Sequence, residues 1–179
     1  TVTVVVTGTN DAPVATDSTG STANEDGVGE ATVNVLDFAS DVDVSDSLTV
    51  VRVDTSNTQG AVGAETDGVF AYSAAGAFDT LGESQSTTDT FVYIVSDGEF
   101  STAAVATIVI TGANDAPVAA DPSATAVAVS QGGVDSVDVL GVATDVDAGD
   151  VLSQPSFGTV GTLGTVSTTA TAGVLSYDA

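Results

Sequence analysis

The sequence contains no cysteine and no histidine, and its single basic residue, Arg52, stands against 25 acidic residues, for a formal net charge of −24. Without thiols and imidazoles, the chain cannot build the usual zinc sites, a thiol nucleophile or a Ser-His-Asp triad. Without a basic surface, it cannot hold nucleic acid or an anionic membrane by releasing counterions. A phosphate-binding glycine loop with its lysine is also missing. These absences predict a protein that is not an enzyme and that binds neither nucleic acid nor membranes.

Aromatic residues make up only 5 % of the chain, and no apolar run approaches the roughly 18 residues that a membrane-spanning helix needs. Hydrophobic residues nevertheless account for 42 %, mostly valine and alanine, which is too many for a disordered acidic segment. A small core without disulfides needs another source of stability, and the negative charge needs counterions. Divalent cations would meet both needs, whereas a solvated acidic surface suited to a salty habitat is the alternative.

Short strand-like runs of β-branched and aromatic residues dominate the chain, and clusters of Gly, Asp, Asn and Ser separate them. No stretch shows a sustained helical period with caps. About seven short strands in roughly 100 residues indicate an antiparallel β-sandwich with Greek-key connections. The strand positions of Tyr72 and Tyr93 place both rings in the core. The predicted strands include residues 1–7, 33–35, 48–53, 69–72, 91–95 and 105–110.

One phrase occurs twice in the chain. Thr-Gly-Thr-Asn-Asp-Ala-Pro-Val-Ala at residues 7–15 returns 104 residues later as Thr-Gly-Ala-Asn-Asp-Ala-Pro-Val-Ala at residues 111–119. The same shift relates Asp-Val-Asp at residues 41–43 to Asp-Val-Asp at residues 145–147. Two separate motifs in one register indicate a tandem array whose unit is about one small domain long. The shift also relates Asp46 to Asp150 and Leu48 to Leu152.

The repeat sets the expected domain boundaries. We predict that residues 1–12 are the last strand of a preceding repeat plus a linker, because residues 1–7 correspond to residues 105–111. Residues 13–112 then form one complete sandwich, and residues 113–179 are a linker and the N-terminal part of the next repeat. That last piece lacks counterparts of the final two strands, so its sheet would have an open edge. Either more chain completes it or another copy of the protein does.

The repeated motifs carry oxygen ligands. Each Asn-Asp pair precedes an Ala-Pro step, and proline stiffens the backbone and favours an extended residue before it. Alternate carboxylates of an Asp-x-Asp pair can face one cation, and calcium takes about six to eight oxygens. For a single pair, turn formation and protection of strand edges is the favoured explanation. Repetition of both motifs in one register favours calcium binding.

Together these motifs resemble cadherin-type domains, and more closely the bacterial cadherin-like, VCBS-type tandem repeats of large repeats-in-toxin surface adhesins. The resemblance lies in residues 8–15, 41–43, 72–83 and 88–98 and covers essentially the whole chain. It implies an all-β fold of tandem cadherin-like, Ig-like Greek-key β-sandwiches with calcium between successive domains. The glycine-rich nonapeptide of the calcium-binding β-roll is absent.

The resemblance also implies which residues bind calcium at each junction. The linker here lacks the additional Asp that cadherins carry ahead of Asn-Asp, so the three-ion count of animal cadherins does not transfer. The N-terminal junction would use Asn10, Asp11, Asp41, Asp43 and Asp97, and the C-terminal junction would use Glu25, Asp79, Glu83, Asn114, Asp115, Asp145 and Asp147.

The function implied by the resemblance is mechanical. We expect a calcium-stiffened extender repeat of a large bacterial cell-surface adhesin, extracellular and supporting cell adhesion or biofilm formation. Its partners would be neighbouring repeats of the same chain. The alternative is a structural repeat that self-assembles with other copies into an extracellular filament, sheath or surface layer. Direct polysaccharide binding is the weakest of the three hypotheses, because few aromatic residues are available to stack on a sugar.

Overall fold

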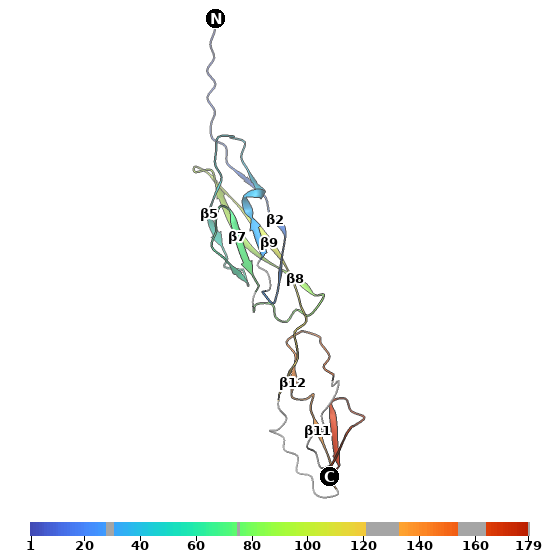
Figure 1. The fold of residues 1–179 in the computed structure, drawn as a ribbon. Coiled ribbons are helices and arrows are strands. Elements are labelled where there is room, and N and C mark those ends of the chain that lie inside the picture. Colours follow the sequence, from blue (N-terminus) through green and yellow to red (C-terminus); the bar gives the residue numbers. More distant parts are fainter. Residues whose placement is uncertain (28–30, 75, 121–132, 154–163, 179) are drawn as a thin grey trace. The chain divides into compact units, whose positions relative to one another are not determined.

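Two compact units make up the chain, residues 1–113 and residues 114–179. The described parts of both units consist of β-strands and loops, with one short 3-10 turn (Figure 1). In these parts we find no helix with the length and apolar character that crossing a membrane requires. The computed structural model describes residues 1–27, 31–74, 76–120, 133–153 and 164–178.

The first unit is a β-sandwich whose larger sheet has four strands in the order β2-β9-β8-β5. β8 (Ser86–Ser96) and β9 (Ser101–Thr111) pair antiparallel along all 11 residues, and β5 (Thr49–Asp54) pairs antiparallel with β8. β2 (Ser18–Asn24) pairs with β9 in parallel, unlike the fully antiparallel sandwich that the sequence predicts. The two strands are parallel because the first and last strands both run from the entering linker toward the leaving one.

The smaller sheet of the first unit has three antiparallel strands in the order β3-β7-β6. Its strands are β3 (Ala31–Asn34), β7 (Val69–Ser73) and β6 (Ala61–Val62). A separate short pair joins β1 (Val14–Ala15) to β4 (Ala39–Ser40). The first part of the chain therefore pairs with β4 before it crosses to the larger sheet as β2.

A 3-10 turn, η1 (Val35–Phe38), follows β3 directly. The side chain of Asn34 caps this turn by accepting a hydrogen bond from the N–H of Leu36 at 3.2 Å. The strand predicted through Val35 ends at this point, because the cap bends the backbone and the N–H of Val35 donates instead to the carbonyl of Gly68 at 2.9 Å.

The core of the first unit lies between its two sheets. Phe70 and Phe91 contact each other across the sandwich with ring centroids 5.2 Å apart and planes tilted by 57°. Tyr72 and Tyr93 are 1 % and 0 % exposed, so the prediction that both are core residues is confirmed. The remaining buried apolar residues are mostly aliphatic: Ala23, Ala31, Val33, Val35, Ala74, Phe78, Val95, Ala104, Ala106, Ile108 and Ile110.

Residues 1–7 pair with no strand in the described structure. Their valines are largely exposed, with Val2, Val4 and Val6 at 91 %, 78 % and 86 %. Their assignment to a preceding repeat, and the domain boundaries that depend on it, stay predictions.

The described part of the second unit contains a three-stranded antiparallel sheet in the order β11-β14-β13. Its strands are β11 (Val134–Asp138), β14 (Val174–Asp178) and β13 (Thr165–Thr168). A short pair joins β10 (Val118–Ala119) to β12 (Ala143–Thr144). These elements follow the same order as β3-β7-β6 and β1-β4 of the first unit.

Equivalent local backbone hydrogen bonds occur within each of the two units. The N–H of Val139 donates to the carbonyl of Gly173 at 2.8 Å, as the N–H of Val35 does to Gly68 at 2.9 Å. Both glycines have positive φ, 84° at Gly68 and 76° at Gly173. The repeat read from the sequence is therefore reproduced in the conformation of the chain.

Candidate metal centre

An acidic loop, residues 41–46, follows β4 in the first unit. The N–H of Asp43 donates to Oδ1 of Asp41 at 2.9 Å, and the N–H of Asp46 donates to the carbonyl of Asp43 at 3.0 Å. The first bond is typical of an Asx turn, in which an aspartate side chain organises the residues that follow it. As a result, one carboxylate oxygen from each of Asp41, Asp43 and Asp46 lies within 4.8 Å of the others.

The linker of the first unit is hydrogen-bonded to this end of the sandwich. The N–H of Asp11 donates to Oδ2 of Asp43 at 2.8 Å, and the side-chain amide of Asn10 donates to Oδ2 of Asp97 at 3.0 Å. Hydrogen bonds therefore join the five ligands predicted for the N-terminal junction into two groups. One group contains Asp11, Asp41 and Asp43, and the other contains Asn10 and Asp97.

Asp97 lies in the turn between β8 and β9. Its Oδ1 accepts hydrogen bonds from the N–H groups of Glu99 and Phe100, both at 2.7 Å. Desolvation raises the pKa of Asp97, but these two bonds and the amide of Asn10 outweigh it and hold the pKa below its usual value. The carboxylate is thus ionised and held in one orientation beside the linker.

The acidic loop has no basic partner among the described residues. Oδ2 of Asp41 is buried and accepts no hydrogen bond there. Arg52 instead forms an exposed ion pair with Asp54 at 4.0 Å. Two like charges at 4 Å repel by about 1 kcal/mol in bulk water and about 4 kcal/mol near a protein surface. A cation among the three carboxylates would remove this repulsion.

The second unit builds the same loop at residues 145–150. The N–H of Asp147 donates to Oδ1 of Asp145 at 3.0 Å, and the N–H of Asp150 donates to the carbonyl of Asp147 at 3.4 Å. The N–H of Asp115 donates to Oδ2 of Asp147 at 2.8 Å, as Asp11 does to Asp43. The three loop carboxylates again lie within 4.8 Å of one another.

Burial distinguishes Asp147 within this second loop. Its side chain is 5 % exposed, and its Oδ1 accepts no hydrogen bond from the described residues. Leaving a charged oxygen buried and unpaired is costly, because it has lost its water without gaining a partner. A bound cation is the simplest compensation for such an atom.

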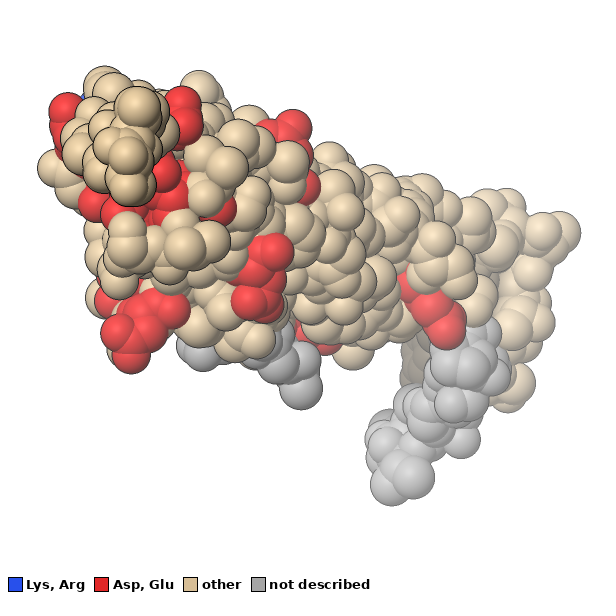
Figure 2. Space-filling model, turned by 90° about the horizontal axis from the view of Figure 1, so that it is seen from above, with Lys and Arg blue, Asp and Glu red and all other residues tan. Residues whose placement is uncertain are grey.

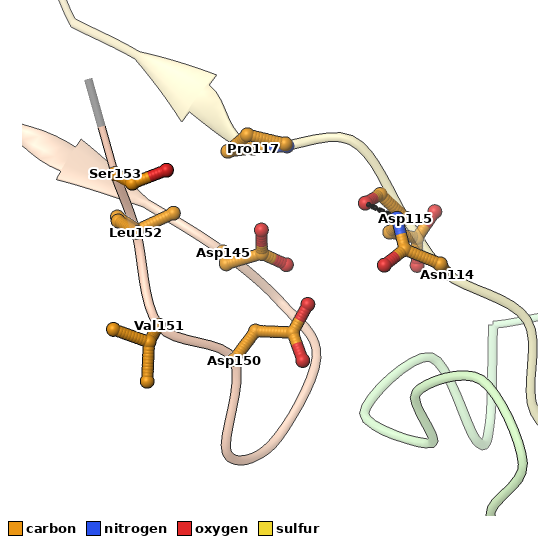
Figure 3. Close-up of a pocket in the computed structure, with 8 residues that line it drawn as sticks. All are labelled: Asn114, Asp115, Pro117, Asp145, Asp150, Val151, Leu152 and Ser153. Carbon is orange, nitrogen blue, oxygen red and sulfur yellow. Dashed lines mark hydrogen bonds between the residues drawn. The ribbon is translucent and has the colours of Figure 1, made fainter. Parts of the chain in front are cut away.

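A hollow of about 210 Å³ lies beside this loop in the second unit. Figure 3 shows Asp145 and Asp150 pointing into the space that Asn114 and Asp115 border from the linker. The amide of Asn114 donates to the carbonyl of Asp115 at 2.6 Å, which shapes the linker there. The lining residues are Asn114, Asp115, Pro117, Asp145, Asp150, Val151, Leu152 and Ser153.

Acidic side chains are spread widely over the surface. Figure 2 shows red Asp and Glu side chains at many places on the visible face and hardly any blue. Exposed acidic groups by themselves do not define a site. The two loops differ from this background because backbone hydrogen bonds hold their carboxylates together.

Glu25 was predicted as a ligand of the C-terminal junction, and it lies at the C-terminal end of the first unit. The side chain is fully buried, and its Oε1 accepts a hydrogen bond from the N–H of Ala113 at 3.0 Å. The N–H of Glu25 in turn donates to the carbonyl of Thr111 at 3.0 Å. Glu25 therefore orders the start of the linker that leads to the Asn-Asp phrase.

Asp79 and Glu83 lie in the loop between β7 and β8, and both side chains are exposed. This loop reaches the leaving linker, because the N–H of Gly112 donates to the carbonyl of Gln85 at 3.0 Å. Neither residue belongs to a group of three close carboxylates in the described part of the chain. The proposal that residues of the first unit share ions with Asn114, Asp115, Asp145 and Asp147 stays a prediction.

Sequence reasoning did not include Asp46 and Asp150 among the ligands. Both complete a carboxylate group in the structure. The available signal was their place in the 104-residue register, which linked them to the Asp-x-Asp motifs. Their role depends on a loop that turns back on itself, and spacing alone does not show that turn.

The donor atoms in both loops are carboxylate oxygens, with amide and backbone oxygens nearby. Hard oxygen donors suit calcium or magnesium, and an irregular loop that offers several carboxylates fits the flexible coordination of calcium better than the octahedral demand of magnesium. The residues present therefore fit calcium.

Comparison with known proteins places the chain in a family. The family model of the bacterial cadherin-like domain matches residues 10–112, which is more than half of the chain. No curated protein matches the chain. The chain therefore belongs to the bacterial cadherin-like domain family, a family of non-enzymatic structural domains, and membership indicates an extracellular repeat domain. The predicted resemblance and the predicted all-β class are both confirmed.

Two solved structures are similar in part. One is an endo-fucoidan hydrolase, MfFcnA4, from glycoside hydrolase family 107, with 15 % identity, a TM-score of 0.34, and coverage of 93 % of this chain and 24 % of that chain. The other is a chimeric titin Z1Z2 functionalised with a KLER exogenous peptide from decorin, with 10 % identity, a TM-score of 0.30, and coverage of 94 % and 82 %. The chain spans about a quarter of the length of the fucoidan hydrolase.

Proposed function

We propose that this bacterial cadherin-like chain is a calcium-stiffened extender of a large bacterial cell-surface adhesin, which projects a distal binding region and supports cell adhesion or biofilm formation. The observation that carries the proposal is the bond between linker and acidic loop. Asp11 binds Asp43 in the first unit, and Asp115 binds Asp147 in the second, both at 2.8 Å. A cation in the loop thus acts directly on the linker.

Stiffening follows from electrostatics. Without a cation, the carboxylates of the loop and the linker repel one another, and this repulsion is lowered when the linker moves away from the loop. With calcium bound, oxygen ligands from both converge on one ion, and the linker loses freedom. Pro13 and Pro117 add to this stiffness, because proline restricts the backbone beside the ligands.

The expected affinity suits an extracellular setting. Extracellular calcium modules bind with dissociation constants of about 10⁻⁴–10⁻³ M. The chain would be flexible where calcium is scarce and stiff outside the cell. Its partners in this role are neighbouring repeats of the same chain, whose acidic residues would complete the coordination of the shared ions.

The test combines calorimetric titration of residues 1–179 with calcium and small-angle scattering in calcium and in chelator. We expect binding together with a longer and stiffer particle in calcium. The paired variant Asp43→Asn, Asp147→Asn should bind less calcium and should stay flexible. An unchanged particle in the presence of bound calcium contradicts the extender function.

A second candidate function is self-assembly into an extracellular filament or layer. The observation that favours it is the partial cover of the sheet β11-β14-β13, where Leu175 and Tyr177 are only half-buried. Sedimentation velocity across a concentration series separates the two functions. A monomer at all concentrations favours the extender, and a calcium-dependent series of oligomers favours assembly.

A further inference from the structure

We propose that Asp46 and Asp150 are calcium ligands, and that each repeat thereby holds one ion within its own acidic loop and its own linker, without ligands from a neighbouring repeat. The inference rests on the proposed function for its choice of calcium. It goes further in naming two ligands outside the predicted sets, and in stating that a single repeat suffices for the first binding event.

The loop geometry supplies the first argument. In each repeat, three carboxylates come from a six-residue segment and place one oxygen each within 4.8 Å of the others. In the first unit, the N–H of Asp43 donates to Oδ1 of Asp41 at 2.9 Å, and the N–H of Asp46 donates to the carbonyl of Asp43 at 3.0 Å. Hydrogen bonds within the segment therefore hold the loop in shape, and its third carboxylate comes from Asp46.

A buried oxygen supplies the second and independent argument. Asp147 is 5 % exposed, and its Oδ1 has no hydrogen-bond partner in the described part of the chain. Oxygens of Asp145 and Asp150 lie within 4.8 Å of the same side chain. A buried carboxylate oxygen without a hydrogen-bond partner, close to two further carboxylates, favours a bound cation, because the cation would compensate its charge.

The hollow beside the second loop offers room for an ion and its waters. Its volume is about 210 Å³, and Asp145, Asp150 and Asp115 all line it. Figure 3 shows the two loop carboxylates on one side and the linker residues on the other. The carboxylate oxygens of the loop and a few waters would together supply the six to eight oxygens that calcium takes.

The linker contact orders the events. Oδ2 of Asp147 accepts the N–H of Asp115, which leaves Oδ1 of the same carboxylate for the ion. One side chain can thus hold the ion and the linker at once. Binding in the loop sets the position of the linker first, and ions shared with a neighbouring repeat follow on an ordered scaffold.

The test is calcium calorimetry on residues 1–179 as wild type, Asp46→Asn, Asp150→Asn and the double variant. Asp67→Asn is the matched control, because Asp67 is exposed, lies outside both loops, and has φ 51°, which asparagine tolerates. This control substitution removes one negative charge, as the other variants do, but leaves both acidic loops unchanged. Asp46→Ser and Asp150→Ser give the same readout should an amide disturb the loop, and circular dichroism in chelator checks the fold of every variant.

We expect each single variant to lose one binding event or to weaken it at least about tenfold, and the double variant to lose both. The control should stay within about twofold of wild type. Isotherms of the double variant that match those of Asp67→Asn overturn the inference.

Scattering separates this result from that of the proposed function. If the loops bind calcium through Asp46 and Asp150 but the particle does not stiffen, the extender function fails and the ligand assignment stands. If the particle stiffens equally in the double variant, the ligand assignment fails and the extender function stands.

Discussion

Equivalent positions in the two units differ in burial. Phe70 and Tyr72 on β7 are 0 % and 1 % exposed, whereas their counterparts Leu175 and Tyr177 on β14 are half-buried. Both strands occupy the centre of a three-stranded sheet. In the first unit the larger sheet faces β7, and Phe91 on β8 packs directly on Phe70.

The polar end of Tyr72 shows what a facing sheet adds. Its hydroxyl donates to Oδ2 of Asp89 on β8 at 2.6 Å. The same oxygen accepts the N–H groups of Gln59 and Gly60 at 2.9 and 2.8 Å, from the connection between β5 and β6. One buried carboxylate therefore joins both sheets and a crossing loop. The tyrosine belongs to the local strand, but its burial and its partner come from the opposite sheet.

The largest loss of stability expected from this comparison comes from truncating the apolar side chains at the equivalent positions of β7 and β14. Phe70→Ala should destabilise the first unit by about 3–5 kcal/mol, because it removes a buried ring packed on Phe91 and leaves a cavity. Leu175→Ala should cost the second unit less than about 2 kcal/mol, because its site is only half-buried. Amide hydrogen exchange on the full chain reports each unit separately. Equal losses in both units contradict the difference in packing.

A matched glycine pair should affect both units alike. Gly68→Ala and Gly173→Ala each force a left-handed residue and bring a Cβ against a leucine, Leu36 in one unit and Leu140 in the other. We expect a loss of about 1–3 kcal/mol in each unit, because strain at positive φ is a local cost. Hydrogen exchange at β7 and β14 measures it. A loss confined to the first unit would mean that the two turns are not equivalent.

The smallest expected effect is a dependence on alkaline pH. Desolvation, followed by the hydrogen bond to Asp89, raises the pKa of Tyr72 well above its usual range, and desolvation also raises the pKa of Tyr93. The unfolded chain then loses these protons before the folded one does. The stability they contribute is complete below about pH 10 and declines above it.

Urea unfolding between pH 8 and pH 11 measures this decline, and the variant Tyr72→Phe is the control. The substitution removes one titrating group, so the curve of unfolding free energy against pH should become flatter. An identical slope in the variant would mean that Tyr72 does not carry the dependence.

Much of the fold follows from patterns in the sequence. Alternation along β8 and β9 predicts their strands and the burial of Tyr93, because strand side chains alternate between faces. The parallel pairing of β2 with β9 was not predictable in this way, because alternation does not say which strand lies beside which. The 3-10 turn at Val35 was missed for a related reason, since its cap depends on a single side chain, Asn34.

In the candidate site, too, some features follow from local sequence and others depend on long-range contacts. The sequence by itself determined the paired aspartates of each acidic loop, because the two members lie two positions apart and recur in both repeats, but it did not show the turn that adds Asp46 and Asp150. Only the tertiary structure decided that Asp11 binds Asp43, across 32 residues, and that Asp147 is buried while it retains an unpaired oxygen. Local hydrogen bonds form from neighbouring residues alone, whereas burial and long-range contacts require another part of the chain to occupy the space beside them.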